Sequence, residues 1–261
     1  MKKRVIAAIV ALIISVPLIY KGDLYFYLFA ILLSLLGLRE ILSLITDNSQ
    51  AKLISYISLL TIIGSGIMKT NFDNLIDYKI IGIILLLNCV LMLMNHKNKN
   101  FDIAKCFNII GVTLFLGVAF ETIIITRNMS LYYFIYIFLV ALVTDTFAHL
   151  IGTLFGKHKI NEISPNKSWE GCIGGLCFGS LVSVLFYLIF INQDISIFII
   201  ILITMFLSII AQLGDLFFSQ IKRYYKIKDF SNIMPGHGGI LDRLDSVIFV
   251  SLAFTYFITF I

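Results

Sequence analysis

The sequence predicts an all-α, polytopic integral membrane protein with about nine transmembrane helices and a cytoplasmic N-terminus. Three observations predict this class: the composition, a series of apolar segments of bilayer-spanning length, and an uneven distribution of basic residues. Of the 261 residues, 59% are hydrophobic and only 13% are charged, and the mean hydropathy is +0.99. Soluble domains carry about 25% charged residues, so this composition excludes a soluble globular fold.

A helix needs roughly 20 consecutive apolar residues to cross a bilayer, and nine segments approach or reach that length. They are residues 5–20, 24–46, 53–68, 78–95, 105–126, 131–155, 170–191, 195–219 and 243–261. The first follows Met-Lys-Lys-Arg and resembles the apolar core of a signal peptide. The stretch Val-Pro-Leu-Ile-Tyr-Lys at its end offers no small-x-small cleavage site, which favours a retained helix.

The distribution of Lys and Arg predicts the orientation, because cytoplasmic loops of membrane proteins carry an excess of these residues. With the N-terminus in the cytoplasm, alternation through nine spans places all but four of the 20 Lys and Arg residues on the cytoplasmic side. The four outside are Lys21, Lys69, Lys79 and Arg127. The two long loops, 156–169 and 220–241, then both face the cytoplasm.

The first four or five spans are rich in Leu and Ile and carry few polar residues, as is typical of a structural scaffold. Glu40 and Glu121 are exceptions near the ends of their spans. The sequence leaves two explanations open for them. Each carboxylate either extends to the membrane interface or has a functional role.

The spans 131–155 and 170–191 carry more distinctive residues. Asp145 and His149 lie one helical turn apart in the cytoplasmic half of the first of these spans. Trp169, the only tryptophan, precedes the second and is typical of an anchor at the membrane interface. Four glycines form a small-residue face suited to close helix packing: Gly171, Gly174, Gly175 and Gly179.

The spans 195–219 and 243–261 place carboxylates near the ends that face the cytoplasm. Asp215 shares a helical face with Ser219 and Lys222, at spacings of four and three residues. Asp242 and Asp245 are three residues apart and also share a face. A charged side chain in a bilayer costs at least about 2.5–3.5 kcal/mol, so these residues require an explanation.

Structural ion pairs explain each aspartate separately: Asp215 with Lys222 or Arg223, and Asp242 with Arg243. They do not explain Asp215, Asp242 and Asp245 together, because three neighbouring carboxylates with few deep cations repel one another. Such a group favours a divalent cation. Mg²⁺ prefers one or two carboxylates, water and substrate phosphates to an all-protein cage, which indicates phosphate chemistry.

The loop before the last span has the composition of an anion site. Pro-Gly-His-Gly-Gly runs directly into a predicted helix that begins near Ile240, and backbone N–H groups at a helix start favour anions. The preceding Lys-Arg-Tyr-Tyr-Lys-Ile-Lys-Asp adds cations on the cytoplasmic surface, where an anionic lipid headgroup or a nucleotide arrives.

Residues 219–245, SQIKRYYKIKDFSNIMPGHGGILDRLD, closely resemble the signature of the phosphatidate cytidylyltransferases, the CDP-diacylglycerol synthases. The upstream ISPNKSWEG and QLGD also resemble motifs of that family, in the same order. The specific resemblance covers about residues 140–250. The signature is carried by Ser219, Lys222, Arg223, Lys228, Asp229, Pro235, His237, Gly238, Gly239, Asp242, Arg243 and Asp245.

The chain departs from the family pattern at several positions. Phe218 stands where the family commonly has glutamate, which predicts a lost metal or lysine contact or an altered substrate preference. Asn166 and Ser168 stand where Lys and Thr are usual, Met234 replaces a branched or aromatic apolar residue, and His149 replaces a tyrosine.

The resemblance implies that CTP and phosphatidate give CDP-diacylglycerol and pyrophosphate. It also implies an N-terminal transmembrane scaffold over residues 1–130 and a catalytic transmembrane region over 131–261, with cytoplasmic loops 156–169 and 220–241. Asp215, Asp242 and Asp245 are then expected to bind one or two cations, including Mg²⁺. Phosphate neutralisation is expected from four basic residues: Lys222, Arg223, Lys228 and Arg243.

The same resemblance implies roles for the remaining motif residues. Ser219 is expected to hold a phosphate oxygen or a metal-bound water, and His237 to shape the turn with Gly238 and Gly239 and to be a candidate for proton transfer. Ser164, Lys167 and Trp169 are expected to form a second wall of the site, with Asp145 as a further candidate. Asp229 is expected to bind substrate.

The expected setting is the cell membrane, with a multi-pass chain whose active site faces the cytoplasm, a homodimeric state and no nucleic-acid partner. Two alternatives stay open. A cytidylyltransferase acting on another lipid phosphate, of ether or polyprenyl type, is suggested by Phe218. A transporter also buries carboxylates, but near the bilayer centre rather than at cytoplasmic helix ends.

Overall fold

The computed structural model describes residues 2–70, 78–95, 98, 101–160, 164, 167–191, 195–233, 236 and 238–258, with only the backbone for 2–8. Apart from one isolated bridge between Lys159 and Ser168, the regular structure of these residues is helical. The helices are α1 (Lys2–Lys21), α2 (Asp23–Ile45), α3 (Ser49–Ile67), α4 (Tyr78–Met94), α5 (Ile103–Met129), α6 (Leu131–Phe155), α7 (Trp169–Phe190), α8 (Ile197–Tyr224) and α9 (Leu241–Phe257).

The all-α prediction is confirmed, and each predicted span coincides with one helix to within a few residues. Among the described residues, six helices are long and apolar enough to cross a membrane: α2, α3, α5, α6, α7 and α8. The expected total of nine spans and the cytoplasmic N-terminus stay predictions. Helix α8 extends beyond the predicted apolar segment to Tyr224, and its last turn carries Lys222 and Arg223.

The fold separates into two compact units. The first contains Met1–Met129 and Asp229–Leu241, and the second contains Ser130–Lys228 and Asp242–Ile261. The chain passes from the first unit to the second within the first turn of α9. The described residues of the segment 229–241, which contains part of the family signature, therefore belong with the N-terminal helices.

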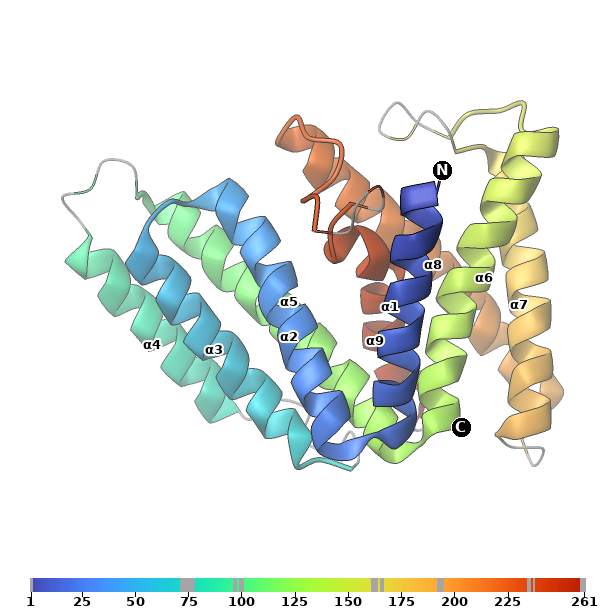
Figure 1. Ribbon diagram of the computed structural model, residues 1–261, viewed down its shortest axis with the longest axis horizontal. Helices are drawn as coiled ribbons and strands as arrows, with labels where there is room; N and C mark the ends of the chain where they lie inside the picture. The colour runs from blue at the N-terminus through green and yellow to red at the C-terminus, as the bar shows by residue number, and fades with distance from the viewer. Residues whose placement is uncertain are drawn as a thin grey trace. The chain divides into compact units, whose positions relative to one another are not determined.

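In the first unit, α2, α3, α4 and α5 run side by side, and α1 packs on α2 (Figure 1). Glu121 of α5 is fully buried, and its carboxylate accepts hydrogen bonds from Ser65 Oγ at 2.9 Å and Lys69 Nζ at 2.8 Å. Glu40 of α2 is also buried, with 3% of its surface exposed. Extension to the membrane interface is therefore the wrong explanation for both glutamates.

In the second unit, the predicted glycine face of α7 packs directly on α6 (Figure 1). A Cβ atom added at Gly175 would lie 2.7 Å from the Thr144 carbonyl oxygen, and one at Gly171 would lie 2.6 Å from that of Ala148. The backbones of α6 and α7 thus lie so close together at these glycines that a larger residue would collide with α6. The structural role predicted for these glycines is confirmed.

Helix α8 completes this unit with α6 and α7, and α9 packs on it. The Thr144 hydroxyl lies 2.9 Å from that of Ser208, which links α6 to α8 by a buried hydrogen bond. A Cβ atom at Gly214 of α8 would lie 2.9 Å from the Asp245 carbonyl oxygen of α9. These close approaches hold the polar ends of α6, α8 and α9 near one another.

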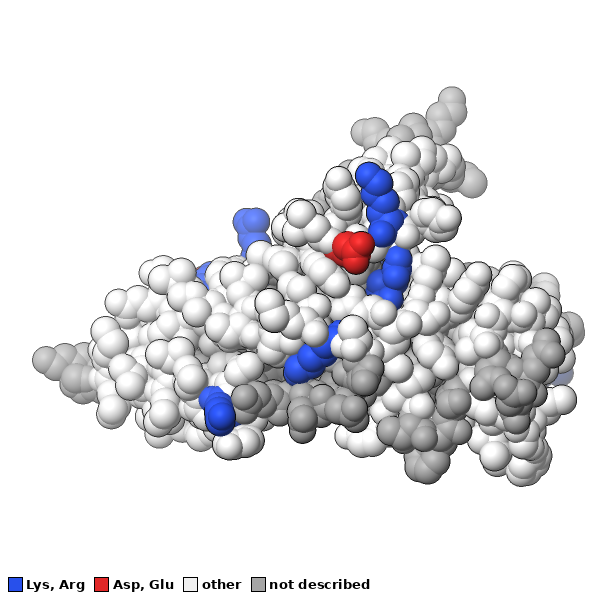
Figure 2. Space-filling view, turned by 90° about the horizontal axis from the view of Figure 1, so that it is seen from below, with Lys and Arg blue, Asp and Glu red and all other residues white. Residues whose placement is uncertain are grey.

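Large apolar side chains are exposed along the outer faces of most helices, including Leu32, Leu86, Leu154, Phe198 and Leu213. On the face shown in Figure 2, basic and acidic side chains are few and most of the surface carries neither. An apolar outer surface of this kind is expected of helices that face lipid.

We predict that Gly175→Ala lowers the melting temperature of the detergent-solubilised protein by several degrees. The added methyl group would collide with the Thr144 carbonyl oxygen and Ala148 Cβ, which outweighs the gain of about 1 kcal/mol from removing a helical glycine. Gly111→Ala in α5 is the matched control, because nothing lies within 4 Å of its added Cβ. Equal melting temperatures for the two variants would contradict the packing described.

Candidate active site

The loop before α7 is closed at its base by Glu170, in the first turn of that helix. The Glu170 carboxylate accepts hydrogen bonds from the backbone N–H groups of Lys157 (3.2 Å) and His158 (3.3 Å), and lies 2.6 Å from His158 Nδ1. The N–H of Trp169 also donates to the His158 carbonyl oxygen at 2.9 Å. The two ends of the loop are thereby joined, and Lys167 is held close to the start of α7.

Ser168 fixes the point where α7 begins. Its hydroxyl accepts a hydrogen bond from the Gly171 N–H at 3.1 Å, which is the usual arrangement of a serine N-cap. A Cβ atom at Gly152 would lie 3.2 Å from the same hydroxyl. The family departure at Ser168 is thus compatible with a capping role, since threonine and serine both cap helices.

Lys167 and Asp215 form the first ion pair of the site. Lys167 Nζ lies 2.5 Å from Asp215 Oδ2, and both side chains are partly exposed, at 23% and 28%. The Ser219 hydroxyl, one turn further along α8, donates to Asp215 Oδ1 at a longer 3.4 Å. Asp215 thus pairs with a lysine from a loop distant in sequence, rather than with only the helical neighbours that the sequence suggested.

Lys222 and Asp242 form a second, more deeply buried ion pair between α8 and α9. Lys222 Nζ lies 2.7 Å from Asp242 Oδ1, with 13% and 4% of the two side chains exposed. The sequence suggested Lys222 as a partner of Asp215 and Arg243 as a partner of Asp242. The structure instead uses Lys222 to hold the start of α9 against the end of α8.

Ser246 links two further carboxylates and was not predicted from the sequence. Its hydroxyl donates to Asp145 Oδ2 at 2.6 Å and lies 3.4 Å from Asp245 Oδ1, while its N–H donates to Asp245 Oδ1 at 2.8 Å. Asp145 of α6 therefore joins Asp245 of α9 through one serine. The only sequence signal for this role was the position of Ser246, directly after the last aspartate of the signature.

The electrostatics of this region are dominated by carboxylates. Asp145, Asp215 and Asp245 repel one another, and burial deprives Asp145 and Asp245 of much of the solvent that would screen that repulsion. The ammonium groups of Lys167 and Lys222 oppose it only in part. The arrangement is therefore suited to accept additional positive charge.

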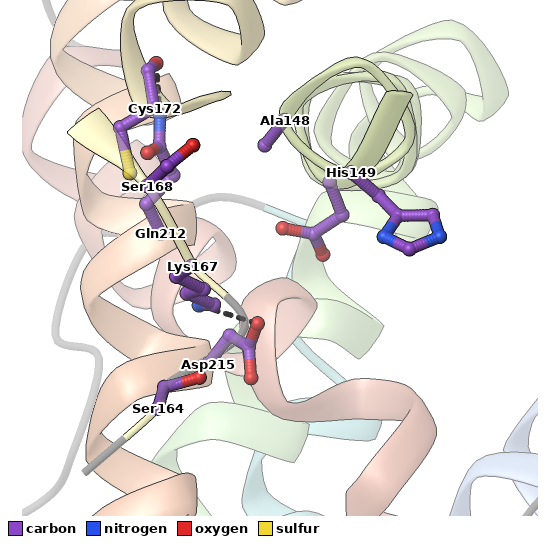
Figure 3. Close-up of a pocket in the computed structure, with 9 residues that line it drawn as sticks. Ala148, His149, Ser164, Lys167, Ser168, Cys172, Gln212 and Asp215 are labelled. Carbon is purple, nitrogen blue, oxygen red and sulfur yellow. Dashed lines mark hydrogen bonds and ion pairs between the residues drawn. The ribbon is translucent and has the colours of Figure 1, made fainter. Parts of the chain in front are cut away.

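A pocket of about 220 Å³ opens beside the Lys167–Asp215 pair (Figure 3). Its lining comes from α6, the loop, α7 and α8: Asp145, Ala148, His149, Ser164, Lys167, Ser168, Cys172, Gln212 and Asp215. Figure 3 shows the His149 ring directed away from the Lys167–Asp215 pair. Of the three residues expected to form a second wall of the site, Ser164 and Lys167 line this pocket.

Comparison with known proteins identifies the family. A model described as the cytidylyltransferase family matches residues 2–261. The chain belongs to the cytidylyltransferase family. Proteins named phosphatidate cytidylyltransferase from Staphylococcus saprophyticus and Staphylococcus aureus are each 38% identical to it over 258 residues, covering 96% of both chains. The same name, identity and coverage apply to a relative from Staphylococcus haemolyticus over 253 residues. The sequence-based recognition is confirmed.

The other signature residues lie in two settings. Arg223, Lys228, Asp229 and Arg243 are exposed at the end of α8, in the segment after it and in the first turn of α9. Trp169 is also exposed, at 57%, and does not line the pocket.

Gly238 and Gly239 are buried in the first unit, and Gly238 has φ +85°, a conformation that favours glycine. His237, together with Pro235, Met234 and Asn166, lies outside the described residues.

Phe218, at the position where the family resemblance led us to expect glutamate, is fully buried. Its ring packs edge-on against Phe217 at 5.7 Å and Phe249 of α9 at 6.3 Å between centroids. A side chain at this position is therefore part of the contact between α8 and α9. Aromatic packing thus occupies this position, and the lost metal or lysine contact or altered substrate preference that the sequence suggested stays a prediction.

The three aspartates expected to bind metal are not gathered into a ready-made cage. Among the described residues, no group of three or more His, Cys, Asp or Glu is placed to hold a metal ion. Mg²⁺ uses one or two carboxylates and completes its coordination with water and substrate phosphates, so a site for it does not require three acidic residues in one group. The assignment of metal ligands therefore stays a prediction.

The two lysine–aspartate pairs predict different mutational costs. Lys222→Met leaves the Asp242 carboxylate buried without this partner, so we expect a loss of about 3–5 kcal/mol in the free energy of unfolding. Lys167→Met removes the more exposed pair, for which about 1 kcal/mol or less is expected. Denaturant unfolding of the two variants in the same detergent measures the difference, and equal losses would contradict it.

Proposed function

We propose that the protein transfers a cytidylyl group from CTP to phosphatidate, forming CDP-diacylglycerol and pyrophosphate. The observation that carries this proposal is that the residues shared with the cytidylyltransferase signature include the buried Lys222–Asp242 pair and Asp245, with Asp215 beside them. The relatives named phosphatidate cytidylyltransferase, which cover 96% of the chain, support the choice of substrate.

In the proposed reaction, an oxygen of the phosphatidate phosphate attacks the α-phosphorus of CTP, and the bond from that phosphorus to the pyrophosphate oxygen breaks. The nucleophile is already anionic, so little general-base activation is needed. The difficulty lies in bringing two polyanions together. Positioning and electrostatic stabilisation then supply most of the rate enhancement.

The basic residues perform the neutralisation in this proposal. Lys222 lies at the carboxylate site, while Arg223, Lys228 and Arg243 are exposed nearby in sequence and bind the phosphates of CTP and phosphatidate. Lys167 has a special position, because its ammonium group is held at the mouth of the pocket by Asp215. Binding of a phosphate there would draw Lys167 away from that carboxylate.

We assign metal binding to Asp215, Asp242 and Asp245, with one or two cations including Mg²⁺. Such a cation would neutralise charge on the reacting phosphates. The mutual repulsion of Asp145, Asp215 and Asp245 supports a cation at Asp215 and Asp245, because a cation relieves it. Ser219 orients Asp215 and holds a phosphate oxygen or a metal-bound water.

The remaining motif residues have supporting roles in the proposal. Ser164 lines the pocket and contacts substrate, and Trp169 and Asp229 extend the binding surface. His237, Gly238 and Gly239 together shape the turn before α9 against a phosphate. His237 is also the candidate for proton transfer in this proposal.

The proposed setting is a cell membrane crossed nine times, with the N-terminus and active site facing the cytoplasm and the chain forming a homodimer. The asymmetry of Lys and Arg between the loops supports the orientation, and CTP is available on that side. The homodimer is supported only by the family resemblance. A cytidylyltransferase acting on another lipid phosphate stays the alternative that Phe218 suggests, and the full burial of Phe218 supports a packing role for this residue.

We predict that membranes containing the protein incorporate radiolabelled CTP into chloroform-soluble lipid only when phosphatidate and Mg²⁺ are both supplied. A panel of lipid phosphates, including ether-linked and polyprenyl phosphates, should show preference for phosphatidate. Substrate flux across proteoliposomes without consumption of CTP would instead identify a transporter and contradict the proposal.

Asp245→Asn, and equally Asp245→Ala, should lower this incorporation by at least about 100-fold, the order expected when an electrostatic contact to the transition state is lost. Asp102→Asn provides a control, since that aspartate caps the N-H of Lys105 in α5 and lies in the other unit. Normal expression and near-normal turnover of the Asp245 variants would rule out the metal assignment.

A further inference from the structure

The buried carboxylate of Glu40 makes three hydrogen bonds to one short segment of the chain. Oε1 accepts from the Ser231 hydroxyl at 2.5 Å and from the Ile240 N–H at 2.8 Å, and Oε2 accepts from the Leu241 N–H at 3.0 Å. All four residues belong to the first unit. The segment they define ends at the first residue of α9.

These contacts make Glu40 the N-terminal cap of α9. The first N–H groups of a helix have no partner within the helix, and a nearby Ser, Thr, Asp or Asn side chain normally accepts from them. The residues directly before α9 are Gly239 and Ile240, neither of which has a side-chain acceptor. A carboxylate from α2, 200 positions earlier in the chain, takes this role and also suits the positive end of the helix dipole.

The neighbouring glycines are explained by the same contact. A Cβ atom at Gly239 would lie 2.7 Å from both Cδ and Oε2 of Glu40, so only glycine leaves room for the carboxylate. A Cβ atom at Gly37, one turn before Glu40, would lie 3.1 Å from Leu241 Cδ2. Helix α2 therefore contacts the start of α9 and the residue before it at two positions, Gly37 and Glu40.

We propose that Glu40 is a positioning residue that fixes where α9 begins and thereby orients Asp242 and Asp245. Asp242 directly follows Leu241, whose N–H Glu40 holds, and Asp245 lies one turn further along the same helix. Glu40 touches neither substrate nor cation in this role. The inference rests on the proposed function for its effect on activity, but its structural part stands independently.

The structural part is tested by hydrogen exchange on the full-length, detergent-solubilised protein. In Glu40→Ala, peptides covering residues 238–245 should exchange at least about tenfold faster, because the Ile240 and Leu241 amides lose their acceptor. Glu40→Gln keeps the size of the side chain but only one acceptor oxygen, so an intermediate rate is expected. If the alanine variant fails to fold, the glutamine variant provides the same comparison.

The functional part is tested by the Mg²⁺ concentration that gives half-maximal incorporation of CTP into lipid. Loss of a group that orients metal ligands typically costs 10–100-fold in metal affinity or activity, so we expect a rise of about tenfold or more in Glu40→Ala. The KM for CTP should change less than this. Glu121→Gln, at the other buried glutamate of the same unit, controls for general destabilisation and should leave the Mg²⁺ requirement and the exchange of 238–245 unchanged.

A double-mutant cycle with Gly239 gives a third readout. Gly239→Ala should impair the protein on its own because its methyl group collides with the carboxylate, yet add little in the Glu40→Ala background, where that carboxylate is absent. Additive effects, or wild-type exchange at 238–245 in a folded Glu40→Ala protein, would overturn the proposal. If Glu40→Ala loses exchange protection at 238–245 but the wild-type protein shows no cytidylyl transfer, the cap is established and only the proposed function is refuted.

Discussion

The central physical constraint in this molecule is that a carboxylate removed from water must find a cation or hydrogen-bond donors inside the protein. The structure meets it in three ways: with lysine for Asp215, Asp242 and Glu121, with a shared serine for Asp145 and Asp245, and with the open end of a helix for Glu40. Each solution ties together segments that are distant in the sequence. The buried acids therefore determine how the polar ends of the helices are connected.

The apolar packing of the second unit provides the frame for these connections. Because α7 presents glycines to α6, the two backbones approach closely, and the loop that joins them is short enough to be closed by Glu170. That closure places Lys167 within reach of Asp215 on α8. The glycine-lined contact between α6 and α7 thus contributes to the position of the Lys167–Asp215 ion pair beside the pocket.

The sequence predicted the helices well because apolar length and flanking charge are local properties, and all nine expected segments have a helix. It also predicted that Asp215, Ser164 and Lys167 belong together, since the family motifs carry them. It could not predict partners that depend on tertiary distance. Helical spacing suggested Lys222 for Asp215, whereas a loop lysine is closer, and nothing local indicated that Glu40 would cap a helix 200 residues away. Phe218 could be interpreted only once its burial between α8 and α9 was known.

A site for two polyanions would be expected to be basic, yet its deepest described groups are mostly acidic. The two properties are compatible if they act on different parts of the substrates. The basic end of α8 and the segment after it, with Lys222, Arg223, Lys226 and Lys228, attract phosphates over the distance at which charges act in solution. The carboxylates beyond them would repel those phosphates unless a cation came between. A phosphate substrate that arrives with its own Mg²⁺ satisfies both sets of charges, whereas a bare anion satisfies only the first.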